Sequence, residues 1–162
     1  MSASDPVIDQ RALRKEIAAF LDSQHVVSLA TVVEGAVHAA CVMYAPEDLS
    51  LCWTSDPDTR HSLAIERDPR VAATVAPDYT DFRLIRGIQI AGRARRLGDA
   101  AETAHARELL RRRFPFLREL DGAPAALRAA IDKAAYYRLD PDTITLIDNT
   151  RGFGDRRTLR IP

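Results

Sequence analysis

The sequence predicts a mainly β protein with peripheral helices, an α+β fold in which six to eight strands form an antiparallel barrel. Apolar runs with strand-like alternation recur between turn signals, and one short helical segment interrupts them between the third and fourth runs. A chain of 162 residues with 46% hydrophobic content can bury the core of one domain. We therefore expect a single domain over residues 1–162.

The first predicted element is an amphipathic helix over residues 8–24. Its apolar residues recur at helical spacing, and they are Leu13, Ile17, Phe20 and Leu21. The period then changes to that of strands, because residues 26–33 and 36–44 flank the turn Glu34-Gly35 and predict a β-hairpin. Residues 49–53 are expected to extend this hairpin into a meander.

A short helix is predicted over residues 57–67, because Ser55-Asp56-Pro57-Asp58 supplies an N-cap, a proline at the first helical position and acids in the first turn. Asp68-Pro69 ends this helix, because a residue that precedes proline is disfavoured in the helical region. Residues 71–75 then resume as a β-branched strand.

The second half of the chain predicts one long strand, a second long helix and more strands. Gly92, inside the strand at residues 85–97, indicates a bulge or the close approach of another backbone or a ligand. The helix spans residues 100–113 and has Ala104, Leu109 and Leu110 as apolar positions, and Phe114-Pro115-Phe116 ends it. The later predicted segments are partly helical structure up to residue 132, strands at 134–139, 143–148 and 156–161, and a turn at 149–154.

These elements divide the domain into four parts. They are an N-terminal helix (1–24), a barrel core (25–98), a helical insertion (99–132) and C-terminal strands (133–162).

Composition and charge disfavour several classes of function. The 23 basic residues balance 23 acidic ones, so no global field favours nucleic acid or an anionic membrane. No apolar run approaches the roughly 18 residues of a membrane span, and residues 1–10 lack the pattern of a signal peptide. We expect a cytoplasmic protein without a nucleic-acid or membrane partner. The clustered arginines are interpreted as a solvated helical face: Arg107, Arg111, Arg112 and Arg113.

The two cysteines, Cys41 and Cys52, lie in predicted strands on either side of a turn. If Pro46-Glu47 forms a two-residue turn, the cysteines are cross-strand neighbours and a disulfide is geometrically conceivable. In a reducing compartment we favour two buried free thiols instead.

The four histidines show no spacing with cysteines or acids that is typical of a metal site, so no metal is expected. They are His25, His38, His61 and His105. The chain also lacks a nucleophile elbow and a Walker loop, which disfavours hydrolases and nucleotide triphosphatases.

The strongest functional signal is the end of the third strand. The apolar run ends at Trp53 and is followed by the hydroxyl groups of Thr54 and Ser55. Two basic residues, Arg60 and His61, come shortly afterwards. Hydroxyls and cations near a helix start suit a phosphate. The alternative interpretation is a capped helix with a surface arginine and histidine.

Three further segments together resemble a small bacterial branch of the FMN-binding split-barrel superfamily of pyridoxamine 5′-phosphate oxidase. They are Leu84-Ile85-Arg86-Gly87-Ile88-Gln89, Arg113-Phe114-Pro115 and Asp148-Asn149-Thr150-Arg151-Gly152-Phe153-Gly154. The resemblance implies a split-barrel homodimer that holds two FMN molecules at its subunit interface and acts as an oxidoreductase. The flavin would carry the electrons, so no side chain is assigned a catalytic role.

The resemblance also implies which residues bind the cofactor. Trp53, Thr54 and Ser55 match the residues that end the strand beside the flavin, Arg60 matches the first phosphate cation, and His61 stands where a lysine is usual. Because a histidine titrates near neutrality, phosphate affinity is expected to fall as pH rises.

Two departures from the family pattern concern the cofactor. The strand at residues 36–44 lacks the family's arginine and offers only His38 as a basic residue. The flavin-contacting glutamine falls at Gly87, and Gln89, on the same face, is assigned in its place. His25, His38 or Arg93 of the partner subunit could complete the site.

The C-terminal tryptophan and arginine signature of the oxidases is not recognisable in this sequence. We therefore do not assign the vitamin substrate of those oxidases to this chain. Gln89, Arg93 and Arg95 alternate on one strand face, where we favour the dimer seam over the cofactor. The alternative functions are a split-barrel dimer that has lost flavin and acts as a ligand-binding or structural protein, and, more weakly, haem binding.

Overall fold

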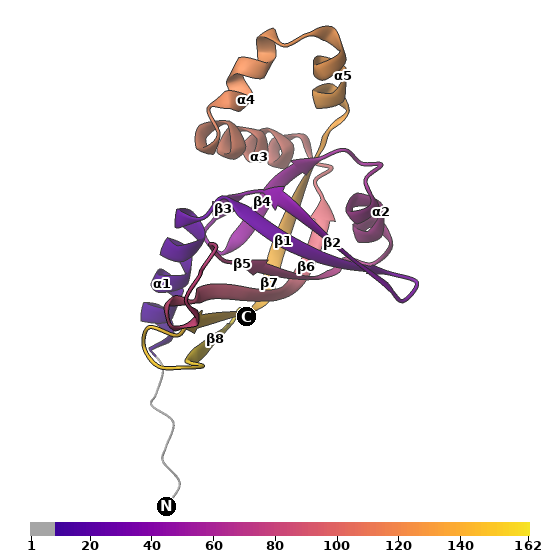
Figure 1. Ribbon diagram of the computed structural model, residues 1–162. Helices are drawn as coiled ribbons and strands as arrows, with labels where there is room; N and C mark the ends of the chain where they lie inside the picture. Colours follow the sequence, from indigo (N-terminus) through magenta and orange to yellow (C-terminus); the bar gives the residue numbers. More distant parts are fainter. Residues whose placement is uncertain (1–8) are drawn as a thin grey trace, which may run out of the picture.

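The computed structural model describes residues 9–162, and Figure 1 labels its helices and strands. The helices are α1 (Gln10–Ser23), α2 (Arg60–Arg67), α3 (Ala100–Arg113), α4 (Phe116–Glu119) and α5 (Ala125–Lys133). The strands are β1 (Val26–Val33), β2 (Ala36–Met43), β3 (Ala45–Glu47), β4 (Ser50–Ser55), β5 (Arg70–Val75), β6 (Arg86–Arg96), β7 (Ala135–Asp148) and β8 (Arg156–Arg160).

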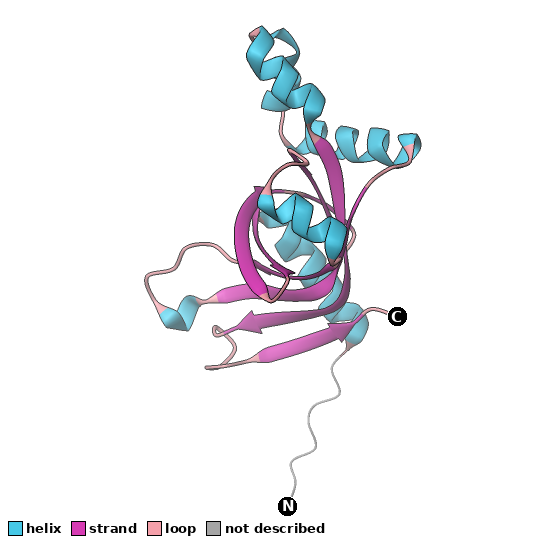
Figure 2. Ribbon diagram, turned by 90° about the vertical axis from the view of Figure 1, so that its right-hand side faces the viewer, coloured by secondary structure: helices cyan, strands magenta, loops and turns pink. Residues whose placement is uncertain are grey.

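The strands form one antiparallel sheet in the order β2-β1-β5-β6-β7-β4-β3, and β8 pairs with β7. The sheet curls on itself, and Figure 2 shows it nearly end-on with α2 in front. In Figure 1, α1 lies along one side of the barrel, and α3, α4 and α5 stand together beyond one end. The predicted antiparallel barrel with peripheral helices is therefore confirmed.

The β1–β2 hairpin forms as predicted from local sequence. Glu34 and Gly35 have φ values of 52° and 80°, which is the left-handed backbone that a two-residue hairpin turn needs. The strands pair from Val33 with Ala36 to Val26 with Met43 without interruption. Helix α3 also keeps its predicted bounds, and Asp99 caps it by accepting hydrogen bonds from the amides of Ala101 and Glu102.

The predicted meander is wrong, because β4 does not pair with β2. Strand β4 lies between β3 and β7, whereas β1 is the partner of β2 within the described residues. The chain leaves the hairpin at buried Tyr44, whose amide donates to the carbonyl of His25 (3.1 Å) and whose hydroxyl donates to the carbonyl of Leu21 (2.6 Å). These bonds redirect the chain, so β2 and β3 fall at opposite ends of the sheet order.

The turn between β3 and β4 lies at Asp48-Leu49 and not at Pro46-Glu47, and Asp48 has a positive φ of 54°. Cys52 therefore faces Ala45, while Cys41 faces Ser28 across the β1–β2 pair. Both thiols are free, as favoured from the sequence. The expectation that both are buried is wrong for Cys41, which is exposed on β2.

Gly92 lies at a bulge where two backbones approach closely, as predicted. The register of β6 against β7 shifts between Ala91 and Gly92, and a side chain at Gly92 would collide with the backbone of Asp140 and Pro141. The bulge accommodates Pro141 within the sheet. One continuous strand, β7, therefore replaces the two strands predicted at 134–139 and 143–148.

Helix α2 begins later than predicted. Its first residue is Arg60 and its N-cap is Thr59, whereas Ser55 is the last residue of β4. Asp56 instead organises a turn, because its side chain accepts from the amide of Asp58 (2.8 Å) and its carbonyl accepts from the amide of Thr59 (3.1 Å). The predicted end of the helix at Asp68-Pro69 is confirmed.

The apolar core divides into two clusters. The larger fills the barrel, where Trp53 and Tyr137 stack with ring centroids 5.6 Å apart, and it includes the four predicted apolar residues of α1. The smaller joins α3 to the outer side of β3 and β4 through Cys52, Ala106 and Leu110. In α3, Ala106 is buried and Ala104 is exposed. Within residues 9–162, no helix has the length and apolar character to cross a bilayer.

Candidate functional site

The end of β4 separates the predicted site residues between the core and the surface. Successive side chains of a strand point to opposite faces. Trp53 points into the barrel and is 1% exposed, and it lines neither of the cavities described below. Thr54 is half-buried on the other face, where its hydroxyl donates to the carbonyl of Ala135 (3.1 Å). The structure therefore places Trp53 as a core residue.

His61 lies in a cluster of hydroxyl groups at the start of α2. Its Nε2 is 2.9 Å from the hydroxyl of Ser55 and 3.2 Å from that of Thr59, which also bonds Ser62 (2.8 Å). His61 is 8% exposed, and this burial lowers its pKa, with the charge of nearby His38 acting in the same direction. At neutral pH His61 is therefore an uncharged imidazole that shares hydrogen bonds with two hydroxyls.

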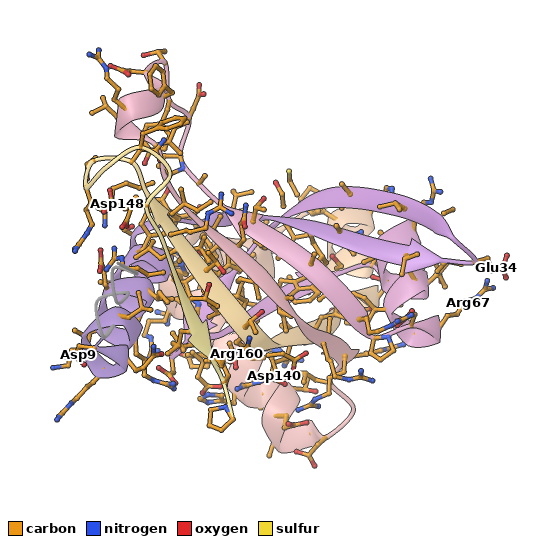
Figure 3. All side chains as sticks on the ribbon, turned by 90° about the horizontal axis from the view of Figure 1, so that it is seen from below. Asp9, Glu34, Arg67, Asp140, Asp148 and Arg160 are labelled. Atoms are coloured by element: carbon orange, nitrogen blue, oxygen red, sulfur yellow. The ribbon has the colours of Figure 1, made fainter. Side chains whose placement is uncertain are left out.

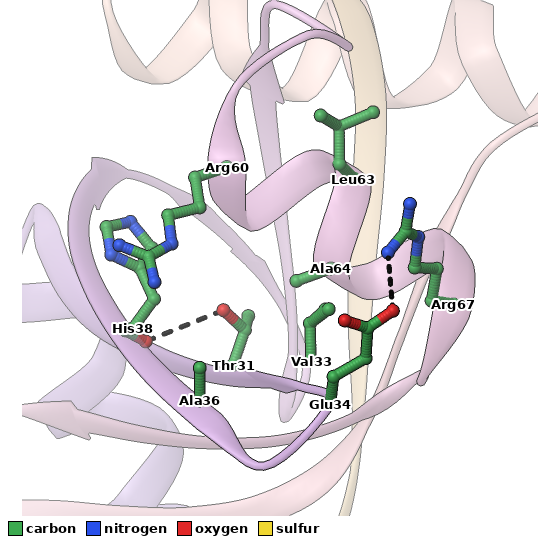
Figure 4. A pocket seen from close by; sticks show the side chains of 9 residues that line it. All are labelled: Thr31, Val33, Glu34, Ala36, His38, Arg60, Leu63, Ala64 and Arg67. Carbon is green, nitrogen blue, oxygen red and sulfur yellow. Dashed lines mark hydrogen bonds and ion pairs between the residues drawn. The ribbon is translucent and has the colours of Figure 1, made fainter.

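Arg60 faces a cavity of about 350 Å³ between α2 and the β1–β2 hairpin, hereafter the Arg60 cavity. Its lining residues are Thr31, Val33, Glu34, Ala36, His38, Arg60, Leu63, Ala64 and Arg67. His38 lines the same cavity, and Figure 4 draws both side chains at one side of it. No carboxylate among the described residues forms an ion pair with Arg60, so its charge is available to a ligand.

Arg67 lines the same cavity but is engaged differently. Its guanidinium lies 3.3 Å from the carboxylate of Glu34 in an exposed ion pair, which Figure 4 draws as a dashed line. Figure 3 shows these two residues together at the tip of the hairpin. The charges of Arg67 and Glu34 therefore offset each other. Arg60 is left as a cation of this cavity that pairs with no described carboxylate.

A second cavity, of about 320 Å³, opens beside the end of β4, and we name it the Phe116 cavity. It lies between β2, the end of β4, α2 and the helices α3 and α4. Its lining residues are Cys41, Val42, Met43, Thr54, Ser55, His61, Leu110, Phe114, Phe116 and Leu117. This wall is apolar and aromatic except for the hydroxyls, the thiol and the imidazole.

Strand β2 connects the two cavities. His38 lines the Arg60 cavity, and Val42, four residues further along on the same face of β2, lines the Phe116 cavity. At about 3.4 Å per residue, these two positions are about 14 Å apart. The surface along β2 thus offers a cation at one end and an apolar wall at the other.

The structure brings four predicted cofactor residues to these cavities: Thr54, Ser55, Arg60 and His61. Gln89 lies elsewhere, exposed on β6 between Thr74 of β5 and Thr145 of β7. Sequence reasoning did not identify the Phe116 cavity, because its aromatic wall comes from helices distant in the sequence. The only signal was the Arg113-Phe114-Pro115 segment of the family resemblance.

Other predicted features have structural partners. Arg95 forms an ion pair with Glu102 of α3 (2.6 Å), and Arg107 lies over the ring of Tyr136, 5.5 Å from its centroid. Arg113 is not part of a solvated face, since its guanidinium reaches the carbonyl of Asp22 (2.8 Å) and packs on Tyr44. Among the described residues, no group of three or more potential metal ligands lies together.

The family model for pyridoxamine 5′-phosphate oxidase matches residues 13–148. A UPF0306 protein of Klebsiella pneumoniae is 33% identical over 143 residues, which cover 86% of this chain and 88% of the relative.

Solved structures share the fold at lower identity. A FAD-binding protein of Mesorhizobium loti aligns with a TM-score of 0.63 at 21% identity, over 80% of this chain and 90% of that one. A heme binding protein of Mycobacterium smegmatis aligns with a TM-score of 0.68 at 23% identity, over 98% of this chain and 60% of that one. These likenesses show a common fold among proteins with different cofactors.

Proposed function

This chain belongs to the pyridoxamine 5′-phosphate oxidase family, and from that premise we propose that it is an FMN-binding oxidoreductase whose flavin phosphate binds in the Arg60 cavity. The observation that carries this proposal is the exposed Arg60 guanidinium in a cavity that His38 also lines, without a carboxylate partner among the described residues. A phosphate would form charge-assisted hydrogen bonds with such a cation.

The remaining contacts fit the elongated shape of a nucleotide cofactor. We place the flat ring of the cofactor along β2, between the Arg60 cavity and the hydroxyls of Thr54 and Ser55, which leaves the apolar wall of Phe114 and Phe116 free. When bound, the flavin supplies the electron transfer. The residues of this chain supply the phosphate contact, the orientation and the exclusion of water, so no side chain is assigned as an acid or base.

His61 contributes to this site as a neutral hydrogen-bonding group at neutral pH. Its pKa lies below the ordinary histidine value because the side chain is buried, so a positive charge develops only in acid. The expected fall of phosphate affinity with rising pH is therefore shifted below about pH 6.5. Arg60 remains the permanent cation of the proposed site.

We further propose that the functional unit is a homodimer. β2 is an edge strand that pairs with β1 alone among the described strands, and both cavities open along it. A second copy against this edge would cover exposed Val37 and Met43 and would shield a cofactor held along β2. The mass of the protein in solution tests this arrangement.

The experiment that tests the flavin proposal is a titration of the purified protein with FMN, followed by the quenching of flavin fluorescence. We expect Arg60→Ala to weaken FMN binding by about tenfold to 100-fold, the equivalent of one charge-assisted hydrogen bond. Arg67→Ala is the matched control, because Arg67 lines the same cavity but is paired with Glu34. Equal FMN affinity in the wild type and Arg60→Ala would refute the assigned phosphate contact.

The same sample distinguishes the other candidates. A colourless dimer that does not bind FMN would favour a ligand-binding or structural protein, for which the absence of an arginine from β2 is the motivation. A Soret band would indicate haem, the ligand named for the Mycobacterium smegmatis protein.

A further inference from the structure

The Phe116 cavity has a lining that differs in kind from that of a phosphate site. Among the residues that the structure describes, those lining it include no lysine, arginine, aspartate or glutamate. His61 is its only ionisable nitrogen, and burial keeps this imidazole uncharged at neutral pH. An anionic ligand would therefore lose its hydration without gaining a cation in return, which is unfavourable.

The apolar part of the wall comes from the helical insertion. Phe114 and Phe116 place their ring centroids 6.2 Å apart, and Leu117 extends the same surface. Phe116 is 44% exposed, so its ring lies at the mouth of the cavity and is open to a ligand. Such a wall suits the apolar body of a small molecule.

The opposite wall offers a small polar region. The hydroxyl of Ser55 and Nε2 of His61 lie 2.9 Å apart and both residues line the cavity. Together with the hydroxyl of Thr54, they can donate and accept hydrogen bonds without contributing a charge. One uncharged oxygen or nitrogen on a ligand would find partners there.

The insertion is also held in position over this site. The ammonium of Lys133, at the end of α5, lies 3.0 Å from the carboxylate of Asp56 and 2.7 Å from that of Asp58. Both acids belong to the loop that joins Ser55 to α2. These ion pairs link the end of α5 to the loop that follows Ser55, which lines the cavity.

We propose that the Phe116 cavity binds a neutral, largely apolar small molecule that carries one hydrogen-bonding oxygen or nitrogen, and that this is the substrate class of the protein. Its identity as substrate rests on the proposed flavin function, whereas its binding does not. The phosphate-bearing end of a cofactor would lie in the Arg60 cavity, and the neutral ligand would lie against the helical insertion.

The test compares two probes of the same shape, naphthalene carboxamide and naphthalene carboxylate, by calorimetric titration at pH 7.5. The carboxamide is neutral and the carboxylate carries one negative charge. We expect the carboxamide to bind at least about tenfold more tightly, because the carboxylate must be desolvated without a cationic partner. Equal affinities, or tighter binding of the carboxylate, would overturn the proposal.

Phe116 and Leu127 are about equally exposed, so lysine substitutions at these two positions form a matched pair of variants. Phe116→Lys should abolish or reverse the preference for the carboxamide, since it places a cation at the cavity mouth. Leu127→Lys is the control, because Leu127 is 45% exposed on α5, does not line the cavity and should leave the preference unchanged. A preference that survives Phe116→Lys, or that Leu127→Lys also removes, would place the probe elsewhere and contradict the proposal.

Titrations of the FMN-free and FMN-loaded protein separate this inference from the proposed function. Binding of the carboxamide to both forms supports the neutral-ligand site. Displacement of the carboxamide by FMN would assign the cavity to the flavin ring, which overturns the inference and leaves the flavin proposal intact. A protein that binds the carboxamide but not FMN would retain this site and refute the flavin function.

Discussion

Arg60 and His61 are consecutive residues at the start of α2, yet they have opposite surroundings. Arg60 is exposed and faces the Arg60 cavity, whereas His61 is 8% exposed and faces the Phe116 cavity. Neighbouring residues of a helix point about 100° apart, so one helix start can serve two cavities. Arg60 and His61 are therefore adjacent in the sequence, but their side chains do not form one basic site.

The two cavities differ accordingly in what they can bind. The Arg60 cavity has a permanent cation that no described carboxylate matches, and the Phe116 cavity has uncharged polar groups against an aromatic wall. The lower pKa of His61 follows from this division, because the apolar neighbours that exclude water also disfavour the imidazolium. Four experiments test this difference between the two cavities.

Replacing His61 with lysine should have the largest effect. An unpaired ammonium in this buried position should lower the free energy of unfolding by about 3 kcal/mol, measured by urea denaturation at pH 7. His61→Gln keeps a neutral hydrogen-bonding group and should cost less than about 1 kcal/mol. A lysine variant as stable as the wild type would show that both positions of the pair accept a charge.

Replacing His38 with alanine should weaken FMN binding by about tenfold, the loss of one hydrogen bond to the phosphate. The measurement is the FMN titration described above. His105→Ala is the control, since it removes another exposed imidazole, on α3, that lines neither cavity. If both variants lose the same affinity, the contact does not belong to the Arg60 cavity.

The pH dependence of stability should identify His61 as a neutral group. Its pKa is lowered in the folded protein, so below about pH 6.5 the unfolded chain binds a proton that the folded chain does not. The free energy of unfolding should therefore fall as pH drops from about 6.5 toward the lower folded-state pKa. His61→Gln should show a smaller fall in that window, and identical profiles would remove His61 as its cause.

Replacing Lys133 with alanine should have the smallest effect. The ammonium bridges Asp56 and Asp58 at the surface, where ion pairs contribute little to stability. Urea denaturation in low and high salt should show a slight loss that disappears as salt screens the charges. A much larger loss would mean that these ion pairs, and not the apolar contacts of α3, hold the insertion to the barrel.

Local pattern was sufficient for the elements with short-range signals. The β1–β2 hairpin and helix α3 form as predicted because the turn at Glu34-Gly35 and the cap at Asp99 are coded by adjacent residues. The pairing of β4 was not predictable in this way, since its partner β7 follows about 80 residues later and the buried Tyr44 redirects the intervening chain.

The candidate site divides in the same manner. Thr54, Ser55, Arg60 and His61 were identified because they are close in sequence and of the right chemical types. Their division between two cavities was not visible, since it depends on α2 beginning at Arg60 and on the burial of one neighbour. Gln89 was assigned by its place in a family pattern and lies exposed on β6, away from both cavities.

Periodicity, caps and turns act over a few residues, so they were enough to predict the class of fold, most helix and strand positions, and the cluster of hydroxyl and basic residues. Tertiary structure alone decided which strands are neighbours, that His61 is buried and neutral, and that Phe114 and Phe116 complete a cavity with the end of β4. Those properties depend on contacts between distant segments, and a side chain's solvation and charge are set by what packs around it.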